Sequence, residues 1–459
     1  MSFFIKGKQL NGTKRAKYSN EKNKKKKVSK SAPGAASARN DEITSSEDEN
    51  FDNEEDVEYS SSEDIHETAQ EKKLRLAKIY LKEIEEEERL RLENKEIDRD
   101  VIAGKLKTDY LKETGKLRLS VADNYKNADC ENISFLKCRM QTNCITCMCL
   151  SSDDKYVYAG SKDGKVVKYS LIDNKKVGII PFVKSNTDKF VGHSSKLNAI
   201  AISTDNKYLA TADESGSVHV WEPETLVHVK SLNGHKNAVM SLTFKKDSHT
   251  LYSGSKDRTI KVWSLDEMAF VETLFGHQDV VTDMDALYRD QLVSSGGRDL
   301  RVWKVTEETQ LIFNGHKGNI DNVKLINEEH FITSGDDGQI CVWSTMRKKP
   351  LAFVNEAHGV SPMNSEPNWI TALASYLNTD LVASGSHDGF IKVWKLDNNF
   401  KLFKLLFTIP LVGFINSIKF TSDGTKLLVA VGREYKLGRW ITEKTAKNGI
   451  YVIPLLKNC

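Results

Sequence analysis

The sequence predicts an all-β protein built on a seven-bladed β-propeller, with a disordered N-terminal tail and an α-helical segment before the propeller. Short apolar runs separated by Gly, Asp and Asn turns fill residues 130–459, a pattern typical of β-strands. Within this part, similar strand endings recur seven times at intervals of about 40 to 50 residues, the period of four-stranded propeller blades. The predicted parts are therefore a tail (1–67), a helical segment (68–129) that packs on the propeller, and the propeller itself (130–459).

The tail divides into two segments of opposite charge. Residues 1–40 hold 12 Lys and Arg against one acid, whereas residues 41–68 hold 13 Asp and Glu and no Lys or Arg. Neither has enough apolar residues to offset the entropy of ordering, so we predict that residues 1–67 are disordered. A cluster of lysines in the first segment is typical of nuclear import signals or of nucleic-acid-binding arms. The predicted nuclear localisation signal consists of Lys22, Lys24, Lys25, Lys26 and Lys27.

The segment before the propeller has helical periodicity. Apolar residues recur at spacings of three or four, as on one face of an amphipathic helix: Leu74, Ala77, Leu81 and Ile84. A second helical stretch covers residues 101–119. We expect the apolar face to pack on the propeller, because the stretch lacks the Trp and Phe that anchor helices in a bilayer. The chain has no run of 18 apolar residues, so we expect no transmembrane helix and no membrane partner.

Five of the repeats end in an alternating run that closes on tryptophan: Trp221, Trp263, Trp303, Trp343 and Trp394. An earlier copy ends in Tyr169, and a later copy, Leu437-Gly438-Arg439-Trp440, ends in Trp440. These make seven repeats. Residues 133–138 and 450–455 both have the pattern of a strand, so the sequence leaves open which of them completes the last blade.

The repeats carry polar residues that predict a structural network. Histidines open five of them: His193, His235, His277, His316 and His358. Aspartates lie six residues before the aromatic residue in four: Asp163, Asp257, Asp337 and Asp388. A buried Asp can accept the imidazole N–H of the His, which links onward to Ser or Thr and to the indole N–H, so that no buried polar group is left unpaired. We place the six tryptophans, Trp440 included, in this network.

Three repeats depart from the pattern. The first has no Gly-His, and Arg139-Met140-Gln141 is its counterpart, while the second has Ser215 in place of the aspartate. In the fourth, Asp299 comes only four residues before Trp303. We expect altered or weaker polar networks in these blades.

No arrangement of residues predicts catalysis. The histidines at the repeat starts are assigned to structure rather than to metal or acid–base chemistry. Cys144, Cys147 and Cys149 have a spacing that invites a zinc site, but no second pair follows at the required distance, so we expect them in the core. The protein is predicted to be a binding scaffold rather than an enzyme, without metal, cofactor or small-molecule substrate.

Cations mark the predicted binding rim. The formal net charge of the whole chain is +3, and residues 130–459 carry +4 of it. A group of cations lies in the last repeat, at Arg433, Lys436 and Arg439, and Arg298 lies beside an earlier turn. Such a rim suits RNA phosphates or an acidic protein.

The period, the Gly-His starts and the Trp endings resemble the WD-repeat family. Segments outside the generic repeat resemble more narrowly the WD-repeat protein family of the U3 small nucleolar ribonucleoprotein: KKLRLAKIYL (72–81), IAGKLK (102–107), VETLFGHQD (271–279), IPLVGFINS (409–417), KLGRW (436–440) and NGIY (448–451). The resemblance runs from about residue 71 to the C-terminus.

This resemblance implies a function in the nucleus and nucleolus. It implies a U3 small nucleolar RNA-binding component of the box C/D U3 ribonucleoprotein, acting in pre-rRNA processing and small-subunit (18S) ribosome biogenesis. The implied partners are the B/C motif of U3 RNA, a small kink-turn-binding protein and other proteins of the small-subunit processome. It also assigns Arg433, Lys436 and Arg439, with Arg298, to RNA or partner contacts.

Two alternatives from other classes stay open. A generic WD-repeat adaptor or scaffold, such as a ubiquitin-ligase substrate receptor or a subunit of a chromatin complex, has the same propeller, but it does not explain the matched helix at 71–81 or the matched segment Leu437–Trp440. A propeller enzyme would need an acid, base or metal group converging in the central channel, and the sequence shows no such group.

Overall fold

The computed structural model describes residues 72–82, 99–137, 139–184, 192–361 and 365–457. The predictions for residues 1–67, including the lysine cluster of the localisation signal, lie outside these residues. The chain separates into two compact parts, Met1–Tyr80 and Leu81–Cys459. Among the described residues, no helix is both long enough and apolar enough to cross a bilayer.

The helices follow the predicted positions with one difference in length. Residues 72–82 are helical and all their side chains are exposed, so the packing of this helix stays a prediction. The second helix, α2 (Arg99–Glu113), ends earlier than the predicted residue 119. Gly115 follows it with a φ of 63°, a left-handed conformation that glycine adopts without steric cost and that commonly ends helices.

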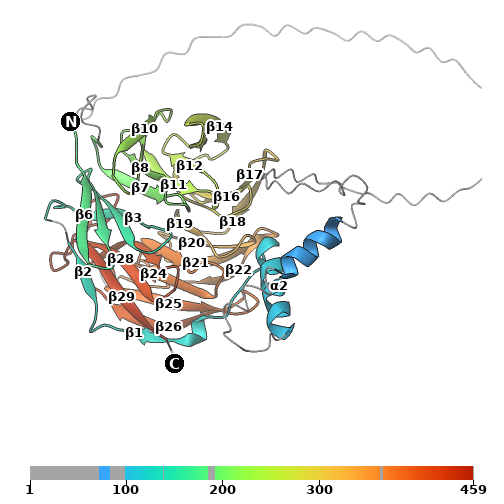
Figure 1. Ribbon diagram of the computed structural model, residues 1–459. Helices are drawn as coiled ribbons and strands as arrows, with labels where there is room; N and C mark the ends of the chain where they lie inside the picture. The colour runs from blue at the N-terminus through green and yellow to red at the C-terminus, as the bar shows by residue number, and fades with distance from the viewer. Residues whose placement is uncertain (1–71, 83–98, 138, 185–191, 362–364, 458–459) are drawn as a thin grey trace, which may run out of the picture. The chain divides into compact units, whose positions relative to one another are not determined.

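Seven antiparallel sheets form the propeller, which confirms the predicted fold (Figure 1). Blades 1 to 3 consist of β3 (Ile145–Leu150), β4 (Tyr156–Ser161), β5 (Val166–Ser170) and β6 (Lys175–Ile180); β7 (Leu197–Ile202), β8 (Leu209–Asp213), β9 (Val218–Trp221) and β10 (His228–Leu232); and β11 (Val239–Phe244), β12 (Thr250–Ser255), β13 (Thr259–Ser264) and β14 (Ala269–Phe275). Blades 4 to 6 consist of β15 (Val281–Ala286), β16 (Gln291–Gly296), β17 (Asp299–Lys304) and β18 (Thr309–Asn314); β19 (Ile320–Leu325), β20 (His330–Gly335), β21 (Ile340–Ser344) and β22 (Arg347–Val354); and β23 (Ala372–Ser375), β24 (Leu381–Gly385), β25 (Phe390–Leu396) and β26 (Phe403–Pro410).

Blade 7 combines strands from both ends of the propeller sequence. Its first three strands are β27 (Phe414–Phe420), β28 (Lys426–Gly432) and β29 (Gly449–Lys457), and both β1 (Tyr125–Ala128) and β2 (Ser134–Leu136) pair with β29. In Figure 1 the cyan strands β1 and β2 lie beside the red strand β29. Both strand patterns that the sequence left open are therefore used, one as the third strand and one at the outer edge.

The core lies between neighbouring sheets rather than at one centre. Trp343, which is fully buried, packs with Phe313 and Phe331 in a cluster shared by blades 4 and 5. Similar clusters fill the other spaces between blades, and burial of each large apolar side chain contributes roughly 1.5–3 kcal/mol. Because each sheet packs between two others, its inner strands are largely buried and apolar, whereas outer strands such as β6 and β18 are largely exposed.

A segment before the first blade binds the lower rim, the rim on which the first and third strands of each blade end. Arg118 donates hydrogen bonds to the carbonyl oxygens of Leu396, Asp397 and Asn398 in blade 6. The chain then passes through a short 3₁₀ helix, η2 (Ala122–Asn124), into β1. The propeller assembly therefore begins before residue 130, the boundary predicted from the sequence.

Candidate functional site

Blade 5 contains the polar network that the sequence predicts. Asp337 Oδ2 lies 2.9 Å from His316 Nδ1, and the second ring nitrogen lies 2.7 Å from Thr333 Oγ1. Trp343 Nε1 donates to the same hydroxyl at 2.8 Å. Burial opposes ionisation of Asp337, but the hydrogen bond from His316 lowers its pKa. The same arrangement recurs in blades 3 and 6, in His235, Asp257, Ser253 and Trp263, and in His358, Asp388, Ser384 and Trp394.

In blade 2 the aspartate comes from a position that the sequence pattern missed. Asp213, two residues before Ser215, lies 3.2 Å from His193 Nδ1, and Ser215 Oγ donates to its other oxygen at 2.5 Å. The network therefore survives where the sequence suggested a gap. Asp213 ends β8, so a scan of the turn alone does not find it.

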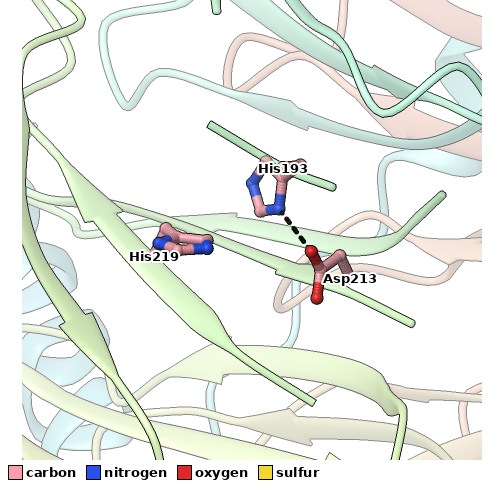
Figure 2. A group of neighbouring side chains, drawn as sticks. All are labelled: His193, Asp213 and His219. Atoms are coloured by element: carbon pink, nitrogen blue, oxygen red, sulfur yellow. Dashed lines mark hydrogen bonds and ion pairs between the residues drawn. The ribbon is translucent and has the colours of Figure 1, made fainter. Parts of the chain in front are cut away.

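His219 lies beside this pair, and the three side chains together have a metal-site spacing (Figure 2). Both ring nitrogens of His193 are already used, one toward Asp213 and one toward Thr211 Oγ1 at 2.7 Å. His219 Nδ1 is 2.8 Å from Ser231 Oγ, and burial lowers the pKa of His219 to about 4. These contacts make the group part of the blade's polar network rather than a set of free ligands.

Blade 4 has an incomplete network, as expected from its shortened turn. Ser294 Oγ lies 2.7 Å from both His277 Nε2 and Trp303 Nε1. His277 Nδ1 is buried and has no hydrogen-bond partner among the described residues. Burial lowers the pKa of His277 to about 3.

Blade 1 replaces the histidine with glutamine. Tyr169 donates its hydroxyl hydrogen to Gln141 Oε1 at 3.0 Å, and Gln141 Nε2 donates to a strand carbonyl at 3.1 Å. Asp163 belongs to an altered network, as expected for a repeat without the opening histidine. It accepts hydrogen bonds from the backbone N–H groups of Thr142 and Asn143 at 2.7 and 2.9 Å.

The cysteine cluster lies at β3, as predicted for core residues. Cys144 and Cys149 are buried, and Cys147 is mostly covered. Burial raises the pKa of the Cys144 thiol to about 12 and that of the Cys147 thiol to about 11. The cluster thus behaves as apolar packing.

The prediction that Trp440 closes blade 7 in its core is wrong. Its side chain is 67% exposed, and it lies on a long loop, residues 433–448, between β28 and β29. The third strand of the blade is β29, which has the run of apolar residues that Leu437-Gly438-Arg439-Trp440 lacks. We call residues 433–448 the blade-7 loop.

The blade-7 loop lies on the upper rim, where the second strand of each blade turns into the third, and it carries three of the predicted contact residues. Arg433 is exposed, and its Nε donates to the carbonyl oxygen of Ala446 at 2.8 Å. Arg439, 68% exposed, forms an ion pair with Glu434 at 2.7 Å. Glu434 also binds Lys162 of blade 1 at 3.0 Å, so the loop is tied to the neighbouring blade.

Lys436 faces a different environment from the two arginines. It lines the central cavity of about 600 Å³ and lies near Asp321 of blade 5. Burial raises the pKa of Asp321 to about 6, and the charge of Lys436 opposes that rise. The structure thus brings the three cations onto one loop but turns Lys436 inward. Arg298, the fourth candidate, is exposed on the turn between β16 and β17 of blade 4, on the same rim.

Aromatic residues beside these cations were missed by the sequence argument. The rings of Trp369 and Tyr435 both contact the ring of Trp440, with centroid distances of 6.1 and 6.0 Å. Together with Pro367 and Ile441 they line a small cavity of about 50 Å³ on the upper rim. The signal for this group was Trp369, the one tryptophan outside the repeat endings.

Comparison with known proteins agrees with the fold. The model described as "WD domain, G-beta repeat" matches residues 226–264, 307–344 and 360–395, and the model "IP5P C-F beta-propeller" matches residues 104–242. A structure described as "Crystal structure of RRP9 WD40 repeats" is 43% identical, with a TM-score of 0.69, and the match covers 72% of this chain and 99% of that one. A second structure, "Structure of U3-55K", has the same identity and TM-score and is covered completely.

Sequence relatives point to one family. The human protein "U3 small nucleolar RNA-interacting protein 2" is 42% identical over 394 residues, covering 85% of this chain and 82% of that protein. The "U3 snoRNP-associated protein-like EMB2271" of Arabidopsis thaliana is 31% identical, covering 85% and 86%. The "Ribosomal RNA-processing protein 9" of Saccharomyces cerevisiae is 28% identical, covering 78% and 79%. Two of these relatives are more than 30% identical and match 85% of this chain, and the chain belongs to the WD-repeat protein family of the U3 small nucleolar ribonucleoprotein.

Proposed function

We propose that this protein is a U3 small nucleolar RNA-binding component of the box C/D U3 ribonucleoprotein. Its role is a scaffold in pre-rRNA processing on the small-subunit (18S) route, in the nucleolus. The observation that carries the proposal is 42% identity, over 85% of the chain, to a protein named for its interaction with U3 small nucleolar RNA. The networks at the histidines of blades 2, 3, 5 and 6 support a scaffold rather than an enzyme, because both ring nitrogens of each histidine are hydrogen-bonded within the blade.

The blade-7 loop is the proposed contact surface. Arg433 and Arg439 present exposed guanidinium groups on the upper rim, and a guanidinium can pair bidentately with phosphate. Lys436 contributes a positive charge at the mouth of the central cavity. Arg298 adds a fourth cation on the same rim. Contacts of this kind fix position on RNA, whereas base contacts supply sequence preference.

The charge balance supports recognition shared with a protein. Residues 130–459 carry only +4, and Arg439 is already paired with Glu434. Because affinity of a basic surface for RNA rises with the number of phosphates it neutralises, a surface with few free cations binds weakly on its own. We propose that the partners are the B/C motif of U3 RNA and the small kink-turn-binding protein bound to it, together with other processome proteins.

Purification of the tagged protein from cells, followed by sequencing of the bound RNA, tests the function. We expect U3 RNA to be enriched far above other small nucleolar RNAs. Equal recovery of all RNAs, or recovery of protein subunits without U3, would favour the generic adaptor.

A variant series tests the contact surface. Replacement of Arg433, Lys436 and Arg439 by alanine should weaken binding to U3 RNA carrying the kink-turn protein and should flatten the salt dependence by about 0.7–0.9 per lost phosphate contact. A matched control removes three exposed cations from the outer strand β22, by replacing Arg347, Lys348 and Lys349. An equal loss of affinity in both variants would show that overall charge, not the blade-7 loop, causes the effect. Unchanged affinity of the blade-7 variant would place the RNA contact elsewhere.

A further inference from the structure

A basic pocket lies on the upper rim at blade 3, away from the blade-7 loop. Its volume is about 660 Å³, and it lies where the turn between β12 and β13 meets the loops that enter and leave the blade. Four cations and one exposed ring line it: Lys236, Lys256, Arg258, Lys261 and Phe275. We call this the blade-3 pocket.

The charge of the blade-3 pocket is strongly positive. The one carboxylate among its lining residues is Asp257, against four cations. Asp257 is occupied: one oxygen lies 2.9 Å from His235 Nδ1, and the other accepts hydrogen bonds from Thr259. Burial opposes ionisation of Asp257, but these bonds lower its pKa to about 2, so it is a fixed charge of the blade network. It is not available to pair with the four cations as well.

Two of the cations are left for a ligand. In the described part of the chain, no carboxylate lies within salt-bridge distance of Lys236 or Arg258, and both are exposed. Lys256 lies 4.0 Å from Glu214, the limit of an ion pair. Lys261 is positioned at the wall of the pocket by a 3.0 Å hydrogen bond from its ammonium to Thr273. The pocket thus combines one cation held by a hydrogen bond with two exposed cations that have no carboxylate partner among the described residues.

Arg258 occupies a backbone conformation that suits glycine. Its φ is 67°, in the left-handed region. The equivalent turns of other blades place glycine there, with φ between 65° and 91°: Gly164, Gly216, Gly338 and Gly389. A side chain in this conformation has a steric cost, so the guanidinium is held on the rim against local backbone preference.

An exposed aromatic ring completes the pocket. Phe275, at the end of β14, has 71% of its surface exposed. A ring beside several cations is the combination with which proteins bind single-stranded RNA, because the ring stacks on a base while the cations hold phosphates. An acidic peptide would use the cations and leave the ring without a specific role.

We infer that the blade-3 pocket is a second RNA-binding site, in which Lys236, Lys256 and Arg258 hold backbone phosphates and Phe275 stacks on an unpaired base. The inference rests on the proposed function for the identity of the RNA. It extends the contact surface from blade 7 to blade 3 of the upper rim. An RNA that reaches both sites is held across the central cavity.

The charge of the pocket is tested in the full-length protein with Lys236→Ala combined with Arg258→Gly. Glycine removes the guanidinium and relieves the φ of 67°, so the urea midpoint should stay the same or rise. Affinity for U3 RNA carrying the kink-turn protein should fall at least tenfold, and the salt slope should fall by about 1.4, or 0.7 for each phosphate on a single strand. The control Lys348→Ala/Lys349→Ala removes two exposed cations from β22 and should change affinity less than twofold.

The ring is tested separately, because stacking and charge have different signatures. Phe275→Ala should lower affinity about fivefold or more while the salt slope stays unchanged, and Phe275→Trp should restore the affinity. A weaker salt dependence of binding in Phe275→Ala, or failure of Phe275→Trp to restore the affinity, would contradict base stacking.

The results separate the pocket from the proposed function. If the wild-type protein prefers U3 RNA and the pocket variants bind it equally well, the blade-3 pocket is not an RNA-binding site, while the proposed function stands. If the wild-type protein binds U3 and an unrelated single-stranded RNA equally well and the pocket variants weaken both, the proposed U3 function is wrong, while the pocket remains an RNA-binding site. Variants that keep full RNA affinity but lose a co-purifying protein show that the pocket binds protein, which also overturns the inference.

Discussion

Replacement of Trp343 by alanine should cost much more free energy of unfolding than the same replacement of Trp440. Trp343 is fully buried between Phe313 and Phe331, and its indole N–H donates to Thr333 at 2.8 Å. Truncation of such a residue leaves a cavity and costs about 3–5 kcal/mol. Trp440 is 67% exposed, so about a third of its roughly 250 Å² is covered. At about 25 cal/mol per Å² its truncation costs at most about 2 kcal/mol.

Urea denaturation followed by far-UV circular dichroism measures both variants without relying on tryptophan fluorescence. The midpoint of Trp343→Ala should fall well below that of Trp440→Ala at a similar m-value. Trp343→Phe is the intermediate control, since it keeps an aromatic ring in the core but loses the N–H and part of the indole volume, so its midpoint should lie between those of wild type and Trp343→Ala. The assignment of Trp440 to the surface would be refuted by equal midpoints in the two alanine variants.

Two further predictions concern acid stability and the segment on the lower rim. Burial lowers the pKa of His277 to about 3 and that of His219 to about 4, so between those values and about pH 6.5 the unfolded chain binds protons that the folded chain does not. The free energy of unfolding should therefore decrease as the pH is lowered through that window, by up to about 1.4 kcal/mol per pH unit for each histidine. The difference in urea midpoint between wild type and His277→Gln should narrow from pH 7 to pH 4.5, and a widening difference would contradict the burial argument. Asp380 is fully buried and accepts hydrogen bonds from the N–H groups of Val121 and Ala122 at 2.8 and 2.9 Å. Asp380→Ala should therefore lower the free energy of unfolding by about 1–3 kcal/mol and speed hydrogen exchange at those two amides. Exchange as slow as in wild type would show that the pairing of β1 holds the segment without Asp380.

The sequence was sufficient for the regular blades because each repeat carries its own signals. The Trp endings mark the third strands, and the histidines mark the loops that enter the blades. Blade 7 differs because Trp440 imitates a repeat ending without the apolar run that a strand buried on both faces requires. That run is present in Ile450-Tyr451-Val452-Ile453, inside the stretch 450–455 that the sequence already marks as a strand.

The binding surface was less predictable than the fold. A sequence shows which residues are charged, but it does not show which charges are already paired. Arg439 is bound to Glu434, and Lys436 faces the central cavity, whereas Lys236 and Arg258 are exposed. These differences depend on side chains that the fold brings together from separate blades or loops, so no local pattern reports them.

Closure of blade 7 has a consequence for the order of folding. Among the described strands, β1 and β2 pair with β29 alone, which lies more than 300 residues further along the chain. During synthesis, blades 1 to 6 can form one after another, but the two N-terminal strands must wait, unpaired, until residues 449–457 have left the ribosome. The final step is therefore a long-range pairing with a high entropic cost, and the growing chain needs its exposed strand edges shielded until the ring is complete.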